Sequence, residues 1–192
     1  MRAFRSTRRF VGLAPVLLVF FWGTVTAADG LEFSEHRIPA GRAPSSVAVA
    51  DFDADGVQDL LVTNSETNDV SILLGLGDGT FQPEMRHGTG VQPLSAAAGD
   101  LDSDGHLDVV VGNRGSSDVS VLLGRGDGTF EPERRLAAPA RGVFELALAD
   151  CDGDGHQDVL GVGFRAVGVH LGEGDGSFSP RWESSVIAGR AL

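Results

Sequence analysis

Three nine-residue segments of this chain place aspartates where their side chains can converge on one point. They occupy residues 51–59, 100–108 and 150–158, and each carries Asp at its positions 1, 3, 5 and 9. Carboxylates crowded on a tightly turned loop repel one another unless a cation lies among them. Ca²⁺ suits such a loop best, because it accepts about six to eight oxygen ligands in a flexible shell.

Position 6 of each segment is glycine, which permits the sharp turn that a Cβ atom would oppose. The carbonyl of position 7 is expected to supply a further ligand. The spacing therefore predicts three Ca²⁺ sites per chain, whose aspartate ligands are Asp51, Asp53, Asp55, Asp59, Asp100, Asp102, Asp104, Asp108, Asp150, Asp152, Asp154 and Asp158, and whose position 7 residues are Val57, His106 and His156.

These segments have two other interpretations. An EF-hand needs Glu at position 12 and flanking helices, but position 12 is Val62, Val111 or Gly161, and the residues after position 9 are typical of a buried strand. The alternative is a set of surface turns without metal, since Asp-Gly is common in turns. Three copies that each keep all four carboxylates favour metal binding.

Residues 1–27 have the pattern of an export signal. Four arginines precede an apolar stretch at residues 11–22, and residues 25–27 offer small side chains at a cleavage site. An uncleaved anchor is the alternative, because no charge occurs between Phe10 and Ala28, although Pro15 favours cleavage. The export route stays open. We expect a secreted, periplasmic or cell-surface protein whose mature region is residues 28–192.

The chain is strongly acidic. Its formal net charge is −12, and removal of the four signal arginines would change this to −16. Twelve of its 27 acidic residues lie in the three loops, where metal would neutralise part of their charge. Such a chain is a poor candidate for binding nucleic acid or an anionic membrane.

Cys151 is the single cysteine, which excludes an intramolecular disulfide. It stands at position 2 of its loop, where the other copies have Phe52 and Leu101. The sequence therefore predicts a buried apolar role for Cys151 rather than a reactive thiol.

The loops belong to a repeat with a period near 50 residues. A short strand of small or β-branched residues precedes each loop, at 46–50, 95–99 and 145–149, and an apolar strand follows it. The next strands are expected at 69–75, 118–124 and 167–172, where Val70, Ile72 and Leu74 alternate as in a half-buried strand. The third copy is two residues shorter before this strand, which predicts a tighter turn.

An Asp-Gly hairpin signal follows at residues 77–81, 126–130 and 174–178, and its aromatic residue is expected to begin a fourth strand. Four antiparallel strands repeating at this period are typical of a β-propeller blade, with the small first strands crowding around an axis. We therefore predict an all-β fold of three blades, at about residues 45–87, 94–136 and 144–184.

These units resemble the FG-GAP/VCBS repeat of integrin α-subunit propellers and of many secreted bacterial proteins. The resemblance rests on Asp-x-Asp-x-Asp-Gly-x-x-Asp and on Gly-x-Gly-Asp-Gly-[Thr/Ser]-Phe, each present three times over residues 29–192. It implies Ca²⁺-stabilised blades, with the twelve aspartates as ligands, and commonly a role in surface adhesion or ligand binding.

Propellers close with about four to eight blades, and only three copies occur here. Asp29-Gly30 stands 22 residues before Asp51, as Asp78-Gly79 stands 22 before Asp100, and residues 188–191 repeat residues 40–43. The sequence thus predicts an incomplete propeller, either truncated, open, or closed by oligomerisation. Its central blade should be the best ordered, and the strand near Phe33 and the last residues the least.

The function expected from these observations is non-catalytic. The module would bind an extracellular protein or glycan, and its open blade edges would favour self-association. His36, His87, His106, His156 and His170 lie in no catalytic motif. The alternative is a non-catalytic propeller fragment of a larger secreted enzyme, such as a hydrolase or lyase.

Overall fold

A computed structural model of the protein describes residue 38 and residues 40–138, 142–164 and 166–185. The predicted signal segment, the strand expected near Phe33 and the last seven residues lie outside the described residues. Every regular element in the described part is a β-strand. No helix there has the length and apolar character needed to cross a bilayer.

The strands form three four-stranded antiparallel sheets, each in simple sequence order. The first sheet comprises β1 (Pro44–Ala50), β2 (Asp59–Asn64), β3 (Asp69–Leu73) and β4 (Met85–Gly88). The second comprises β5 (Pro93–Gly99), β6 (Asp108–Asn113), β7 (Asp118–Leu122) and β8 (Arg134–Ala137). The third comprises β9 (Glu145–Ala149), β10 (Asp158–Gly163), β11 (Ala166–Gly172) and β12 (Phe178–Ser185).

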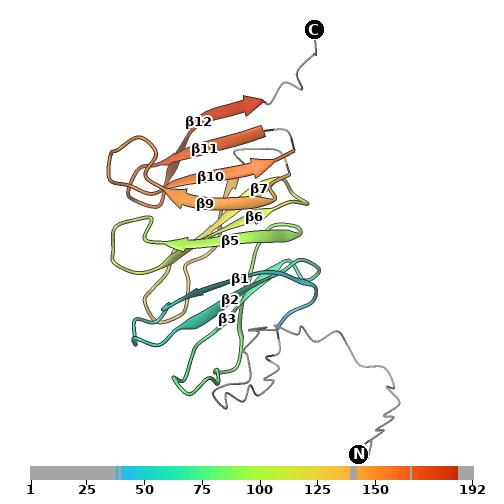
Figure 1. Ribbon diagram of the computed structural model, residues 1–192, viewed down its shortest axis with the longest axis vertical. Coiled ribbons are helices and arrows are strands. Elements are labelled where there is room, and N and C mark those ends of the chain that lie inside the picture. Colours follow the sequence, from blue (N-terminus) through green and yellow to red (C-terminus); the bar gives the residue numbers. More distant parts are fainter. Residues whose placement is uncertain (1–37, 39, 139–141, 165, 186–192) are drawn as a thin grey trace, which may run out of the picture.

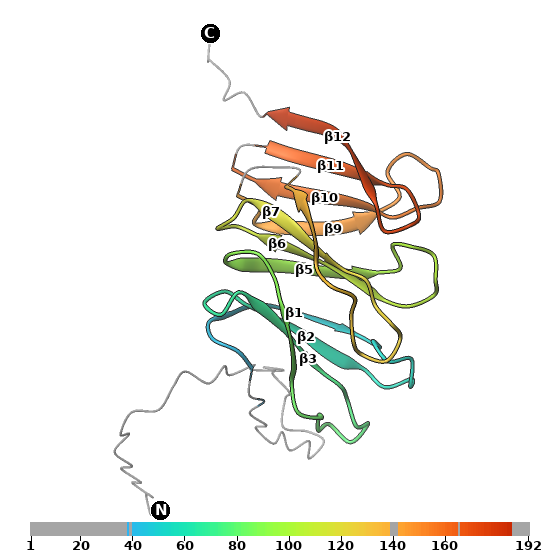
Figure 2. The same ribbon diagram turned by 180° about the vertical axis from the view of Figure 1, so that it is seen from behind.

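The three sheets lie face to face in an open row, with the first and third sheets at its two ends (Figures 1 and 2). The first strands of the sheets are neighbours, because β5 contacts both β1 and β9. The small side chains of β5, such as Ala96 and Ala98, allow this close approach. The all-β fold and its propeller-type four-stranded blades are therefore as predicted, and the row is not closed.

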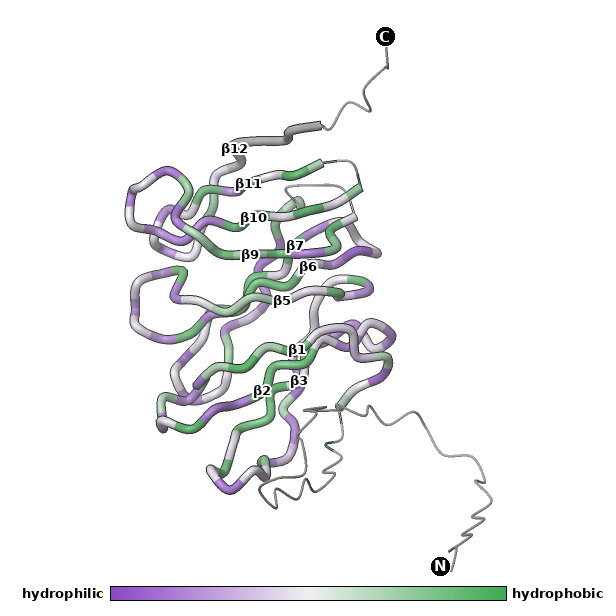
Figure 3. The backbone as a smooth tube through the Cα atoms, viewed as in Figure 1, coloured by the Kyte–Doolittle hydropathy of each residue, from purple (hydrophilic) through white to green (hydrophobic). Residues whose placement is uncertain are grey.

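Apolar side chains lie between consecutive sheets. The backbone tube coloured by hydropathy shows hydrophobic residues along the strands (Figure 3). One cluster joins the first and second sheets and includes Phe52, Ile72, Val111 and Phe130. A second cluster joins the second and third sheets, with Leu101, Val121, Leu146 and Val159 among its members. Burial of these faces, rather than hydrogen bonds between sheets, accounts for most of the cohesion of the row.

The third strand of each of the first two sheets is more deeply buried than the alternation of Val70 and Ile72 predicted. Ser71, on the opposite face of β3, is also fully buried. A polar network accommodates it: the Asn64 amide donates to the hydroxyl of Ser71, which donates to Glu84. Asn113, Ser120 and Glu133 repeat the arrangement in the second sheet. The prediction of a half-buried strand was therefore wrong for β3 and β7, since both of their faces are covered.

The fourth strand starts later than predicted in two sheets. Phe81 and Phe130 form only isolated bridges, to Gly75 and Gly124, and the regular strands begin at Met85 and Arg134. Pro83 and Pro132 fall in the intervening residues, and proline has no N–H to donate to a ladder. In the third sheet, β12 does begin at the aromatic residue, Phe178.

Cys151 is exposed, which contradicts the prediction that it is buried. Its counterparts Phe52 and Leu101 are buried because the next sheet in the row covers them. The backbone N–H of Gly128 donates to the carbonyl of Phe52, and that of Gly176 donates to the carbonyl of Leu101. The third sheet is the last in the row, so among the described residues nothing covers Cys151 in this way.

Candidate metal centres

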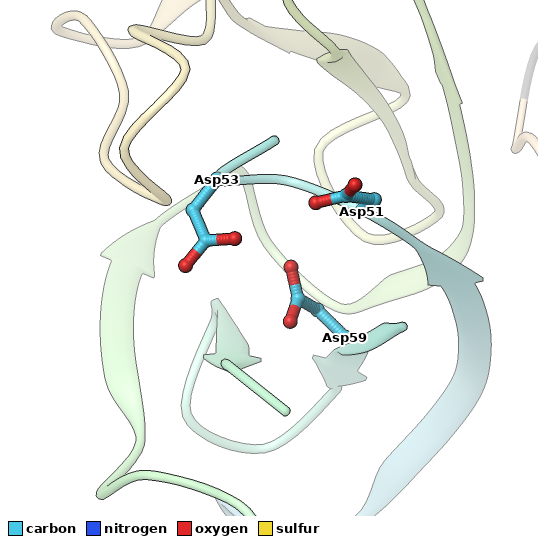
Figure 4. Close-up of side chains that lie close together, drawn as sticks. All are labelled: Asp51, Asp53 and Asp59. Atoms are coloured by element: carbon cyan, nitrogen blue, oxygen red, sulfur yellow. The ribbon is translucent and has the colours of Figure 1, made fainter. Parts of the chain in front are cut away.

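Each Asp-rich loop brings three of its carboxylates together. The grouped residues are those at positions 1, 3 and 9, and in each group the three oxygens lie within 4.8 Å of one another. Figure 4 shows the first group, in which the carboxylates of Asp51, Asp53 and Asp59 face a common space. The loops join β1 to β2, β5 to β6 and β9 to β10, so all three lie along one side of the row (Figure 1).

The aspartate at position 9 is buried and joins its loop to the rest of the sheet. One carboxylate oxygen of Asp108 accepts a hydrogen bond from the N–H of Leu101 at 2.7 Å, and the other accepts from the N–H of Gly124 at 2.7 Å. Asp59 and Asp158 make the equivalent pair of bonds in their own sheets. The aspartate at position 9 therefore fastens the loop to the residues at or just after the end of the third strand. Its carboxylate is also one of the three that lie together in the loop.

Negative charge and burial act together in these centres. Burial raises the pKa of Asp108 to about 6, and the charges of Asp102 and Asp104 add to this, while the two backbone donors oppose it. Burial, followed by the charge of Asp104, raises the pKa of Asp102. The pKa of Asp53 is raised mainly by burial as well. Raised carboxylate pKa values mean that the metal-free loops disfavour their own charge, which a bound cation would reverse.

An unpartnered oxygen in the second loop fits a cation. Asp100 Oδ1 is buried and has no hydrogen-bond partner, although Asp100 Oδ2 accepts from the N–H of Gly105 at 3.1 Å. A buried carboxylate oxygen without a partner is costly, because its water has been removed and not replaced. A metal ion among Asp100, Asp102 and Asp108 would satisfy this oxygen, so the residues present fit such a group.

Positions 5 and 7 are placed differently from positions 1, 3 and 9. The position 5 residues Asp55, Asp104 and Asp154 are not in the three-residue groups, and each accepts a hydrogen bond from the N–H of position 7, at 2.7–2.8 Å. At position 7, the His106 ring lies against Gly126, where it would meet an added Cβ atom at 2.2 Å. The ring of His156 lies in the same way against Gly174.

The backbone geometry gives a role to two positions of the repeat that the sequence did not reveal: position 4 of the loop, and the glycine that approaches the loop after the third strand. Besides the position 6 glycines, position 4 is left-handed, with φ of 57° at Ala54, 63° at Ser103 and 83° at Gly153. Glycine at position 4 of the third loop was the available signal. Gly124, two residues after the end of β7, approaches the loop so closely that a Cβ would lie 2.2 Å from the carbonyl oxygen of Leu107.

A family model matches the chain in two overlapping segments. The model describes the FG-GAP-like repeat, and the matched residues are 51–111 and 100–161. Each segment begins at position 1 of an Asp-rich loop and ends in the strand after the next loop. This protein belongs to the FG-GAP-like repeat family. A comparison with curated proteins found no significant match.

Twenty-five chains among solved structures match the FG-GAP-like chain significantly. One is an Agrocybe aegerita lectin described as recognising non-reducing terminal N-acetylglucosamine, with 24% identity and a TM-score of 0.48, over 68% of this chain and 36% of that one. Another is the Photorhabdus luminescens Tc holotoxin pore, with 20% identity and a TM-score of 0.45, over 74% of this chain and 7% of that one. The chain thus spans a minor part of both proteins, and similarity this low carries no argument about its function.

Proposed function

We propose that this chain is a calcium-binding FG-GAP-like module, exported from the cytoplasm, that binds a protein or a glycan and does not catalyse a reaction. The observation that supports it best is the repeated carboxylate triad, which leaves a buried oxygen of Asp100 without a partner. The predicted export signal agrees with this function, because calcium concentrations outside cells suit sites of moderate affinity.

The donor set favours Ca²⁺ over other biological cations. The triads contain only carboxylate oxygens, whereas Zn²⁺ and Cu²⁺ sites in proteins are usually built with nitrogen or sulfur ligands. Mg²⁺ also binds oxygen, but it requires near-ideal octahedral geometry and keeps several water molecules. The loops can supply further oxygens from position 5 and from the carbonyl of position 7, which would meet the higher coordination number of Ca²⁺.

Calorimetric titration of the mature protein in chelator-stripped buffer tests the metal proposal. We expect uptake of three Ca²⁺ per chain, with dissociation constants of roughly 10⁻⁴–10⁻³ M, as in other extracellular modules. The control replaces the three position 3 residues together, Asp53→Asn, Asp102→Asn and Asp152→Asn, and should abolish uptake. Absence of uptake by the natural protein, or equal affinity for Mg²⁺, would refute the proposal.

An exposed aromatic pair is the surface that we propose for ligand contact. Phe144 and Phe164 are both exposed, and their rings meet edge to face with centroids 4.5 Å apart. The guanidinium of Arg114, from the loop that joins β6 to β7, lies 5.6 Å and 5.9 Å from the two ring centroids. Aromatic faces beside a cation suit the apolar face of a sugar ring or the side chains of a protein partner.

A screen of immobilised glycans and extracellular proteins, with calcium and with chelator, tests ligand binding. A ligand found in this way should bind at least about tenfold more weakly to Phe164→Ala, because exposed aromatic anchors dominate such contacts. Leu76→Ala, which removes an exposed apolar side chain at a hairpin turn, is the matched control and should bind normally. Equal binding by all three proteins would exclude the aromatic pair as the contact surface.

The proposal that the module is not an enzyme rests on the hydrogen bonds that its potentially reactive side chains already make. The carboxylates of the loops accept backbone hydrogen bonds, and Nε2 of His170 lies 2.7 Å from the carbonyl of Ala137. A panel of glycosidase, esterase and lyase substrates tests it. Turnover that survives purification and is lost on mutation of a single residue would support the alternative of an enzyme fragment.

A further inference from the structure

The outward face of the third sheet is apolar. Val162 and Val167 are cross-strand partners on β10 and β11, and both are exposed; Cys151, at the loop end of the same sheet, is exposed as well. Leu160 and Val169 form the next pair on this face and are only partly buried. A terminal repeat that faces water normally carries polar residues, so this face has the composition of a covered surface.

The equivalent face is covered in the other two sheets. Val70 in the first sheet and Val119 in the second have exposed fractions of 0%, whereas Val167 at the same position is 42% exposed. The difference arises because the second sheet packs on the first and the third packs on the second. The face around Val167 is therefore the receiving half of an interface that occurs twice within the chain.

The other half of that interface is only partly covered at the opposite end of the row. In the third sheet, Leu146 of β9 packs against the second sheet and is 6% exposed. Val47, at the same position of β1, is 47% exposed, and its neighbour Val49 is 53% exposed. Leu60, Val62 and Leu73 of this face are buried, with Ile38, Ala40 and Phe81 packed against them, so the exposed part of the face lies on β1.

The hairpin glycines show the same difference between the sheets that contact a preceding sheet and the first sheet, which has no preceding sheet in the described part of the chain. The N–H groups of Gly128 and Gly176 donate to the carbonyls of the preceding sheet, and a Cβ added at either glycine would meet a leucine of that sheet at 2.8 or 3.0 Å. Gly79 occupies the same position in the first sheet, but an added Cβ there would meet nothing within 4 Å. The carbonyl equivalent to those of Phe52 and Leu101 is that of Cys151, which lies in the third sheet, at the other end of the row.

We propose that two copies of this chain associate head to tail, with the first sheet of each copy packed on the third sheet of the other. The contact would bury Val47 and Val49 of one copy against Val162 and Val167 of the second, and Gly79 would donate to the carbonyl of Cys151. Two copies of the described region would supply six sheets, a number within the range of closed propellers.

Sedimentation of the purified mature chain in calcium buffer tests the association, with one arginine placed on each face. The natural protein should sediment at the mass of two chains. Val47→Arg and Val167→Arg should each sediment as single chains, because a buried unpaired charge should raise the dissociation constant at least about tenfold. Both positions are exposed in the single chain, so circular dichroism should show that each variant remains folded.

Mixing the two variants distinguishes this arrangement from other dimers. Val47→Arg keeps an intact third-sheet face and Val167→Arg an intact first-sheet face, so an equimolar mixture should recover a two-chain species. Leu76→Arg is the control for added charge, since Arg125 stands naturally at that position of the second sheet, and it should dimerise normally. A natural protein that stays monomeric, or a mixture that does not recover association, would overturn the proposal.

Discussion

The second and third sheets share one strand order and one loop pattern but differ in how much of their surface is covered. The second sheet lies between two others, and the position 2 residue of its loop, Leu101, is buried in the cluster that joins it to the third. The third sheet has a neighbour on one face only, and Cys151 at the same position is exposed. Burial at a given repeat position is therefore set by the neighbouring sheet and not by the repeat itself.

A second difference concerns the polar network beneath the third strand. In the second sheet, Asn113 and Ser120 are fully buried and bonded to each other. The third sheet has Gly163 and Gly168 at these positions and makes a shorter connection from β10 to β11. The third sheet has thus lost a buried network while keeping its Asp-rich loop, which indicates that the loop does not depend on the network.

The largest expected effect contrasts the position 2 residues of the second and third loops, Leu101 and Cys151. Leu101→Ala should lower the free energy of unfolding by about 2–5 kcal/mol, because it removes a buried side chain and leaves a cavity. Cys151→Ala should change it by less than about 0.5 kcal/mol in the single chain, since its site is exposed. Urea denaturation of both variants at low protein concentration measures the contrast. Equal losses would mean that Cys151 is covered in solution even without a second copy.

The next effect compares two of the three buried position 9 residues, Asp108 and Asp158. Asp108→Ala leaves the buried N–H groups of Leu101 and Gly124 without acceptors, at a cost of about 2–4 kcal/mol. Asp158→Ala should cost less, because the N–H of Cys151 is only partly buried and can bond to water. Thermal unfolding in chelator measures both, and a larger loss for Asp158→Ala would contradict this account of the loops.

A smaller effect follows from the raised pKa of Asp108. Its folded-state pKa is about 6, against an ordinary value near 4 in the unfolded chain, so the folded chain binds more protons between these values. In chelator, its contribution to the free energy of unfolding should therefore rise as pH falls from 7 to 5, which would raise Tm by a few degrees. Asp108→Asn, which cannot titrate, is the control, and an identical pH profile for that variant would exclude Asp108 as the cause.

The smallest effect concerns position 5. Asp104→Ala removes a possible metal ligand and the acceptor for the N–H of His106, but it also relieves the repulsion that Asp104 exerts on Asp102. We expect Tm in chelator to change little, whereas in calcium it should fall, with affinity at the second site weakened by roughly tenfold. Parallel melting curves in the two buffers measure this. An equal fall in both would show that the turn, and not the metal, holds the loop.

The sequence by itself determined the features that depend on local pattern. The period near 50 residues, the alternation of strands and the Asp-Gly turns predicted three four-stranded units, because hydrophobic periodicity and turn chemistry act over a few residues at a time. The spacing of aspartates also predicted loops in which carboxylates converge, and the structure groups Asp51, Asp53 and Asp59 in this way. Whether these groups bind Ca²⁺ remains a prediction.

Only the tertiary structure decided the properties that depend on neighbouring sheets. Leu101 and Cys151 occupy the same position of the repeat, and nothing local to either residue indicates that one is buried and the other exposed. Likewise, the pattern around Ser71 is that of a half-buried strand, and burial on both faces follows from packing between sheets. Burial is a property of the assembled row, since the atoms that exclude water from one sheet come from residues about 50 positions away in the chain.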